Sequence, residues 1–492
     1  MKLPDRSVLR SKFFWVGLLY FAEGLPLGIF YDLFPVQFRQ AGVDLRSIGA
    51  LSLLGLAWTL KFLWAPAIDH WRHHRRWILA MNLAMGGALL ALAAVGGAPG
   101  WVYLAIGAFT LASATNDIAI DGYTIELLDR DELGLANGLR IGFYRVGMLA
   151  AGALLVLSDL IGWTGAYATS AGLLALLGVI VLGAPRERVL PAPEAPIGRE
   201  LQALRRSPPA LLAAGGLLLG TLWLILRQLD ALPPTAGTVL GASAAALLVG
   251  AALWLRRGGG GSTLQTLRQG GLFGALFTLL ERPGILPVLA FVLLFKLADS
   301  AMGFMIKPFW VDAGFTASEI GLVSVNIGLV MSIAGGVAGG WLTDRWGIFR
   351  GLWVLGLVQA LSNLGYAYVA SLFAGLPLEA GIPGAWRGLM YGASMVESFT
   401  GGLGTAAFLA FLMAIVDKQR AATQYALLSS LFALSRSLAG WAGGYGAAGL
   451  GYADYFLLTF FLAFPAYLLL PWVAGMLRRT AGAATSAAPA DG

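Results

Sequence analysis

The sequence contains no cysteine and only three histidines among its 492 residues. The missing thiols exclude disulfide bridges, thiolate metal sites and cysteine nucleophiles. The histidines, His70, His73 and His74, lie among cations in the run HWRHHRR, so a role at a gate or at lipid headgroups is favoured over metal binding. The sequence also shows no pattern of a nucleophile with its base and no nucleotide-binding loop. We therefore expect neither an enzyme nor a bound cofactor.

Charged residues are scarce as well. They make up 12% of the chain, whereas hydrophobic residues make up 58%, which is typical of an integral membrane protein whose main neighbour is the lipid bilayer. The net charge of +7 does not indicate nucleic acid, because the basic residues recur in short turns between apolar runs. With both termini in the cytoplasm, the outer turns hold only Arg39, Arg46, Arg227 and Arg387, as the positive-inside rule predicts.

Long apolar runs are abundant. About 20 apolar residues suffice to cross a bilayer as a helix, and fourteen such helices are predicted, so the expected fold class is an all-α integral membrane protein. Six lie in the first half at 13–38, 47–68, 77–97, 101–124, 135–158 and 163–183. Two follow at 210–227 and 237–255, and the last six at 285–309, 318–341, 351–371, 386–415, 422–447 and 454–477.

These helices divide the chain into four expected regions. Two six-helix halves occupy residues 1–185 and 285–478. Between them, residues 186–284 hold a cytoplasmic linker rich in Pro and Arg, two additional transmembrane helices and an amphipathic segment. A disordered tail is expected at 479–492.

The two halves resemble copies of one another. AGVDLRSIG at 41–49 and AGFTASEIG at 313–321 share Ala-Gly and, six residues later, Ile-Gly. Asp129 and Gly152 match Asp417 and Gly440 at one common offset. A duplicated set of six spans is the arrangement of the major facilitator fold, in which substrate binds between the halves.

Residues 115–152 place carboxylates and guanidinium groups within apolar helices. Asp117 and Asp121 lie four residues apart and therefore share one helix face. If the segment folds back at its charged turn, Asp121 comes level with Arg140 and Asp117 with Arg145. Because two carboxylates one turn apart repel in a medium of low dielectric constant, one is expected to hold a proton near the working pH. We predict proton coupling at this pair; purely structural ion pairs are the alternative.

The same folding test predicts further pairs of opposite charge. Folding the first hairpin brings Glu23 level with Lys61, and folding the hairpin near Asp417 brings Glu397 level with Arg436. Lys296 and Asp299 share a helix face at a spacing of three residues. Charges inside membrane helices are costly unless they are paired, so we expect a substrate to compete for these pairs.

Two glycine-rich stretches have different predicted roles. GGVAGG at 335–340 is predicted to let helices pack closely. For GGLG at 401–404, beside Glu397, close packing and local unwinding are equally favoured.

A candidate gate follows the eighth core span. GGWLTDRWGIFR, at 339–350, resembles the loop signature of major facilitator proteins, in which an acid and a base, here Asp344 and Arg345, help to lock the cytoplasmic side. The N-terminal counterpart, APAIDHWRHHRR, keeps Asp69 and the basic run but lacks the glycines.

With these residues in view, the chain resembles AmpG-type permeases of the major facilitator superfamily over nearly its whole length. The matching stretches include EGLPLGIF, TLKFLWAPAID, SATNDIAIDGY and YRVGMLAAGALLVLSDLIGW in the first half. In the second half they include KLADSAMGFMIKPFW, DAGFTASEIGLV and ESFTGGLGTAAFLAFLMAIVDKQRAATQYALLSSLFALSR. The extra central pair of helices also resembles that family.

The resemblance implies a proton-coupled importer in the bacterial inner membrane that brings anhydro-muropeptides into the cytoplasm for cell-wall recycling. We also expect the protein to be a monomer. These are disaccharides of N-acetylglucosamine and anhydro-N-acetylmuramic acid, with or without a short peptide. The resemblance then gives Arg145, Lys61 and Arg436 the task of holding carboxylates, and gives Glu23, Glu397 and Asn116 that of bonding to sugar hydroxyls and acetamides. Arg140, Lys296 and Asp299 complete the expected substrate site.

Two alternatives stay open. One is import of another bulky anion, of the siderophore or acyl-CoA type. The other is a major facilitator protein that does not transport and acts as an assembly factor or receptor. In that case the buried charges are expected to be replaceable without loss of function.

Overall fold

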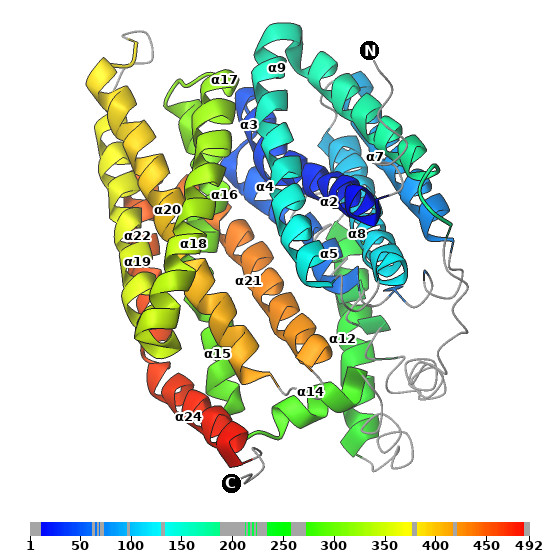
Figure 1. Cartoon of the computed structure of the whole chain (residues 1–492). Coiled ribbons are helices and arrows are strands. Elements are labelled where there is room, and N and C mark those ends of the chain that lie inside the picture. Colours follow the sequence, from blue (N-terminus) through cyan, green and yellow to red (C-terminus); the bar gives the residue numbers. More distant parts are fainter. Residues whose placement is uncertain are drawn as a thin grey trace. The chain divides into compact units, whose positions relative to one another are not determined.

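The computed structural model is helical, and its described part contains no strand (Figure 1). It describes residues 11–61, 64–65, 68, 73–95, 99–128, 133–186, 212, 215–216, 219–220, 223, 234–256, 272–375, 381–416 and 421–486. The chain forms two compact units. The larger comprises Met1–Leu190, Lys296–Phe408 and Ala433–Phe464, and the smaller comprises Pro191–Phe295, Leu409–Phe432 and Pro465–Gly492.

The first part of the larger unit is built from nine helical segments among the residues described. They are α2 (Lys12–Gly28), η1 (Ile29–Leu33), α3 (Phe34–Gln40), α4 (Leu45–Leu51), η2 (Ser52–Gly55), α5 (Leu56–Leu60), α7 (His74–Val95), α8 (Pro99–Leu127) and α9 (Leu133–Val181). Helices α2, η1 and α3 run on without a break, so residues Lys12–Gln40 form one long apolar span. The span stops at Gly42, whose φ of 80° suits glycine, and Asp44 caps the next helix by accepting from the backbone of Arg46 and Ser47.

The later part of the larger unit contains the counterpart helices. They are α16 (Leu297–Asp312), α17 (Ala317–Glu319), η5 (Ile320–Ile327), α18 (Gly328–Trp346), α19 (Ile348–Phe373), α20 (Gly384–Ile415) up to Phe408, α21 (Ala421–Leu450) from Ala433, and α22 (Tyr452–Leu462). Both η1 and η5 are π-helical, a geometry that is rare and frequent at functional sites.

Glycines set the close approach of several helix pairs. Helices α2 and α9 lie side by side (Figure 1), and a Cβ built on Gly24 would clash with the backbone oxygen of Tyr144. In the later part, a Cβ on Gly335 would clash with the backbone of Phe399, and one on Gly339 with that of Leu403. The predicted packing role of the 335–340 stretch is therefore confirmed. Residues 401–404 stay inside the unbroken helix α20, so the structure shows no unwinding there.

The smaller unit contains α12 (Pro234–Arg256), α14 (Leu272–Leu280), α15 (Ile285–Phe295), α24 (Leu470–Ser486) and most of α23 (Phe464–Tyr467). Within it, Phe291 of α15 packs edge-on against Phe411 at 5.4 Å between ring centroids. Arg282 donates to Gln424 at 3.2 Å, and Arg479 to the backbone oxygen of Pro283 at 2.6 Å. Helix α24 continues into the stretch predicted as a tail.

The described residues contain eight helices that are long and apolar enough to cross a membrane, or up to nine if a bent pair near the C-terminus is one span. The predicted fourteen spans are thus not confirmed. One reason is α9, which runs through both the fifth and the sixth predicted span. Its helical course is interrupted only at Gly162, where φ is 76° and two helices meet at a kink. Another is that most of the predicted span 210–227 lies outside the described residues.

Candidate functional site

One cluster of charged side chains lies among the N-terminal helices α2, α5, α8 and α9. Lys61 Nζ lies 3.5 Å from Asp117 Oδ2, and Arg140 Nη2 lies 3.1 Å from Asp121 Oδ1. The hydroxyl of Tyr20 donates to the same oxygen of Asp121 at 2.9 Å. The predicted pairing of Asp121 with Arg140 is confirmed, whereas the cation beside Asp117 is Lys61 rather than Arg145.

Glu23 is the third carboxylate of this N-terminal cluster. It is 8% exposed, and it interacts electrostatically with Asp117, Asp121, Lys61 and Arg140. Its buried Oε2 has no hydrogen-bond partner in the described structure, and neither has Asp117 Oδ1. Among the described residues, three carboxylates therefore face two cations, and two carboxylate oxygens are left for a proton or a substrate hydroxyl.

Amide and hydroxyl groups of α8 adjoin this N-terminal cluster. Asn116 is fully buried and accepts a hydrogen bond from Asn82 of α7 at 3.2 Å, while its own amide nitrogen has no partner in the part of the chain described. Thr115 accepts from the indole of Trp64 at 3.1 Å. These bonds fix the face of α8 that carries Asp117.

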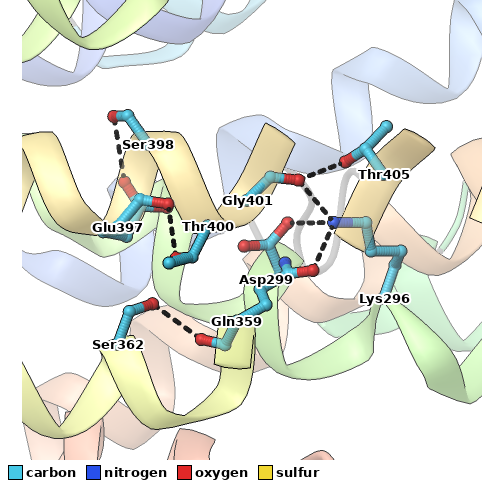
Figure 2. Close-up of polar contacts among 9 residues, drawn as sticks. All are labelled: Lys296, Asp299, Gln359, Ser362, Glu397, Ser398, Thr400, Gly401 and Thr405. Carbon is cyan, nitrogen blue, oxygen red and sulfur yellow. Dashed lines mark hydrogen bonds and ion pairs between the residues drawn. The ribbon is translucent and has the colours of Figure 1, made fainter. Parts of the chain in front are cut away.

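A second cluster lies among helices of the C-terminal half (Figure 2). Lys296 is 1% exposed, and its ammonium points at Asp299 Oδ2 at 3.1 Å, Gln359 Oε1 at 3.0 Å and the backbone oxygen of Gly401 at 3.5 Å. The predicted pairing of Lys296 with Asp299 is confirmed. Glu397 stands on the same stretch of α20 as Gly401 and accepts from Ser398 at 3.3 Å.

A cavity of about 230 Å³ adjoins the C-terminal cluster and is lined by Asp32, Asp299, Glu397, Ser324 and Ser398, among others. Asp32 comes from η1 of the N-terminal half, and Ser324 from η5. Lys307 joins them: its Nζ lies 3.5 Å from Asp32 Oδ1 and donates to Ser324 Oγ at 2.7 Å. Asp32 and Lys307 could not be identified as site residues from the sequence, because 275 positions separate this pair and no hairpin relates them.

Two further arginines of the predicted site lie outside the ion pairs of both clusters. Arg145 and Arg436 come from different halves and are near enough to interact electrostatically. Arg436 lies over the ring of Tyr31, with 3.7 Å from its guanidinium carbon to the ring centroid. Neither arginine forms an ion pair with any carboxylate in the described structure. The predicted pairs Asp117 with Arg145 and Glu397 with Arg436 are therefore wrong. Glu23 and Lys61 do interact electrostatically, but the ion pair of Lys61 is with Asp117.

The two halves meet where α3 ends and α17 begins, which we call the α3 end. There Arg39 Nε lies 2.5 Å from Asp312 Oδ1, and Tyr452 donates to Asp312 Oδ2 at 2.6 Å. The backbone of Ser318 donates to Asp159 at 2.6 Å. These contacts join α3 to α16 and α9 to α17, so the passage between the halves is closed at this end.

Glycines bring the backbones of the two halves together near the α3 end. A Cβ on Gly444 of α21 would clash with the backbone oxygen of Leu45, and a Cβ on Gly321 with that of Gly152. A Cβ built on Gly440 would lie 2.7 Å from the side-chain Cβ of Ser52, so these two residues also pack closely. The matched positions Gly152 and Gly440 thus perform the same task in opposite halves, each seating the fifth span of its half on the second span of the other.

The predicted gate residues are placed only in part. Asp344 and Arg345 are exposed near the end of α18, where Arg345 lies over the ring of Trp341 at 5.5 Å. Among the described residues Asp344 forms no ion pair. Asp69 lies outside the described residues. The lock assigned to these three residues stays a prediction.

Comparison with known proteins places the chain in a family. A family model described as Major Facilitator Superfamily matches residues 16–377. The chain is 28% identical to the anhydromuropeptide permease of Escherichia coli (strain K12), over 92% of this chain and 78% of that protein. It is 22% identical to putative transporter AmpG 4 of Rickettsia conorii, over 94% and 96% of the two chains. The predicted resemblance to AmpG-type permeases is confirmed.

Solved structures show the same fold at lower identity. The POT family transporter PepTSo matches with a TM-score of 0.63 at 15% identity, covering 95% of this chain and 98% of that one. The nucleoside transporter NupG matches with a TM-score of 0.61 at 15% identity, covering 95% and 99%. These relatives and neighbours are transporters, in agreement with the prediction that the chain is not an enzyme.

Proposed function

Because this chain belongs to the Major Facilitator Superfamily, we propose that it is a proton-coupled importer of anhydro-muropeptides. The cargo is a disaccharide of N-acetylglucosamine and anhydro-N-acetylmuramic acid, with or without a short peptide. The printed name of the Escherichia coli relative, an anhydromuropeptide permease, supports this cargo. The lactyl or peptide carboxylates make it an anion.

The observation that carries the proposal is the pair formed by Arg145 and Arg436. Buried cations are costly unless an anion accompanies them, and these two stand near each other with no carboxylate in ion-pair distance in the described structure. Arg436 does interact electrostatically with Asp32, but that carboxylate already pairs with Lys307. The two arginines come from opposite halves. An anionic group bound between them would compensate their charge and would be released when the halves part.

The N-terminal cluster binds the coupling proton in this proposal. Glu23, Asp117 and Asp121 carry one negative charge more than Lys61 and Arg140 balance when all five groups are ionised. A proton on Asp117 or its neighbour Asp121 cancels that excess. Since Arg140 bonds directly to Asp121, movement of α9 against α8 would change the affinity of the cluster for the proton. This links substrate-driven motion to proton uptake and release.

The remaining polar groups bind the sugar in this proposal. Glu23 and Asn116 offer buried atoms without partners in the described structure, and Glu397 and Asp299 line the 230 Å³ cavity. Lys61, Arg140 and Lys296 hold the acids in place until substrate competes for them. Asp69, Asp344 and Arg345 would close the cytoplasmic side, opposite the α3 end.

The membrane placement follows the sequence expectation. The protein is a multi-pass membrane transporter, and its inner-membrane location, monomeric state and two cytoplasmic termini belong to the proposal. The α3 end then faces outwards, and the contacts of Arg39 with Asp312 close the outer side. The halves 1–185 and 285–478 would move against each other, with the insert at 186–284 outside that motion.

Uptake assays test the cargo. Proteoliposomes with the full-length protein should accumulate radiolabelled anhydro-muropeptide, and unlabelled anhydro-muropeptide should compete whereas a siderophore or an acyl-CoA should not. Loss of a charge-assisted hydrogen bond costs about 1.5–3 kcal/mol, so Arg145→Gln or Arg436→Gln should weaken substrate affinity roughly ten- to hundredfold. Arg436→Lys keeps the charge and serves as the matched control. Competition by acyl-CoA alone would contradict the proposed cargo.

A further inference from the structure

A pocket that the central clusters do not use lies at the α3 end of the N-terminal half. Its volume is about 590 Å³, and it lies between α3, α4, α7, α8 and the part of α9 after the kink. This volume falls within the range of roughly 300–1,000 Å³ that small-molecule sites occupy. The cavity at the C-terminal cluster, at about 230 Å³, is smaller than that range. We call this space the α3-end pocket; it is lined among others by Gln37, Asp44, Ser47, Tyr103, Trp163 and Tyr167.

The lining of the α3-end pocket combines flat aromatic rings with short polar groups. Tyr103, Trp163 and Tyr167 contribute rings, and Gln37 an amide. Thr164 and Ser47 add hydroxyls, and Asp44 adds a carboxylate. A pyranose ring has one face of C–H groups and a rim of hydroxyls. Aromatic faces cover the first, because they offer apolar area with a polar edge, while amide, hydroxyl and carboxylate groups bond to the second.

The rings are held in place before any ligand arrives. The indole of Trp163 donates to Gln40 Oε1 at 3.0 Å, and the hydroxyl of Tyr167 donates to Gln37 Oε1. The two rings lie 6.3 Å apart, tilted by 40°. Gly162, with φ of 76°, makes the kink that turns Trp163 towards α3, a conformation that L side chains rarely adopt. Such fixed groups lower the entropic cost of binding.

Asp44 is a carboxylate acceptor at this site at neutral pH. Partial burial acts to raise the pKa of Asp44, but hydrogen bonds from the Ser47 side chain and from the backbone of Ser47 and Arg46 outweigh it and lower this pKa below its ordinary value. Ser47 Oγ donates at 2.6 Å. The charge is therefore both fixed in position and present under physiological conditions.

We infer that the α3-end pocket is a second saccharide site, which binds a pyranose unit on the outer side while the passage between the halves is closed. It adjoins the closure directly: Arg39 donates to the backbone oxygen of Val43, which lines the pocket, at 2.9 Å, and the same guanidinium bonds to Asp312 of the other half. A bound sugar thus touches the segment that carries the closing residue. The choice of an N-acetylated sugar as ligand rests on the proposed function, whereas the site itself rests on the pocket.

The lack of cysteine allows a direct test with a single introduced thiol. Thr164 is exposed at the pocket, so Thr164→Cys should be tolerated and should react with a polar maleimide. In the purified full-length protein, N,N′-diacetylchitobiose at about ten times its Kd should slow this labelling roughly tenfold. Ala374→Cys is the matched control: it is exposed just after α19, outside the pocket, and its labelling should not change. Sorbitol, a linear polyol, should protect neither thiol.

Two further variants separate the pocket from the central site. Adding Trp163→Ala to Thr164→Cys should remove the protection, because the indole face is lost. Adding Asp117→Asn should leave the protection intact while proton-driven uptake is lost. Absence of protection in Thr164→Cys, equal protection by sorbitol, or loss of protection through Asp117→Asn would each overturn the inference. Protection by chitobiose in a protein that transports no muropeptide would refute the proposed function alone.

Discussion

Lys61 Nζ lies 3.5 Å from Asp117 Oδ2, so an ammonium from the second span of the N-terminal half neutralises a carboxylate of the fourth. Asp117 is 6% exposed, and its other oxygen has no hydrogen-bond partner in the described structure. The pair therefore joins two helices and also leaves one oxygen free to take a proton. Both tasks depend on the positive charge at position 61.

Replacing Lys61 tests this double task. Lys61→Gln removes the charge, and because a hydrogen bond to a charged group contributes about 1.5–3 kcal/mol, initial uptake rates should fall roughly ten- to hundredfold. Lys61→Arg keeps the charge and should retain most of the uptake. Rates measured in proteoliposomes at equal protein density decide the matter. Full activity in Lys61→Gln would show that the pair is dispensable.

Gly444 tests the contact between the halves at the α3 end. A Cβ at this position would clash with the backbone oxygen of Leu45, and overpacking costs about 1–3 kcal/mol, so Gly444→Ala should disfavour the state closed at this end. Spin labels on Ala41→Cys and Ala374→Cys, exposed positions in opposite halves, should report a larger population of long distances. Gly449→Ala, on the same helix with open space around it, should leave the distances unchanged. If both variants behave alike, the contact does not control closure.

Arg39 and Asp312 form the ion pair of that closure, with side chains 24% and 27% exposed. Pairs near the surface contribute only about 0.2–1 kcal/mol, so Arg39→Gln should shift the spin-label distances in the same direction as Gly444→Ala but less. The charge exchange Arg39→Asp with Asp312→Arg should restore part of the closed population. A double variant no better than the single ones would argue against a direct pairing.

Asp44, which lies outside the membrane spans, makes the stability of the protein depend on pH. As the N-cap of α4 it contributes about 1 kcal/mol, and its pKa in the folded protein is lowered. This contribution is therefore present above the ordinary aspartate value and is lost as the pH falls through the lower folded value. Thermal unfolding should show Asp44→Ala less stable than the parent at pH 7, with the difference shrinking under strongly acidic conditions. A difference that does not depend on pH would contradict this role.

The membrane class, the helical fold and the family could be predicted from the sequence, because apolar length and local motifs carry them. The pair of Asp121 and Arg140 could be predicted for a similar reason. One short turn joins the two helices that carry these residues, so residues at equal distances along the chain from the turn lie at equal depth in the membrane. The same reasoning failed for Asp117, because depth does not say which way a side chain faces. Arg145 lies near Arg436 of the other half instead, and Lys61 comes from a third helix.

Contacts between the halves could not be predicted by any folding of neighbouring helices. Asp32 with Lys307 and Arg39 with Asp312 join residues more than 270 positions apart, and their pairing depends on how the two bundles pack. The internal repeat held one usable clue. Gly152 and Gly440 occupy matched positions, and each of them seats a helix on the opposite half. The fourteen predicted spans stay unconfirmed because α9, in which two helices meet at Gly162, counts as one span, and because most of the predicted span 210–227 lies outside the described residues.

The most direct test of the central claim compares Asp117→Asn with the unaltered protein in proteoliposomes under an inwardly directed proton gradient. The parent protein should accumulate radiolabelled anhydro-muropeptide and lose that accumulation when a protonophore is added. Asp117→Asn should still exchange labelled for unlabelled substrate but should not concentrate it. Accumulation driven by the gradient in both Asp117→Asn and Asp121→Asn would contradict the assignment of the proton to this pair.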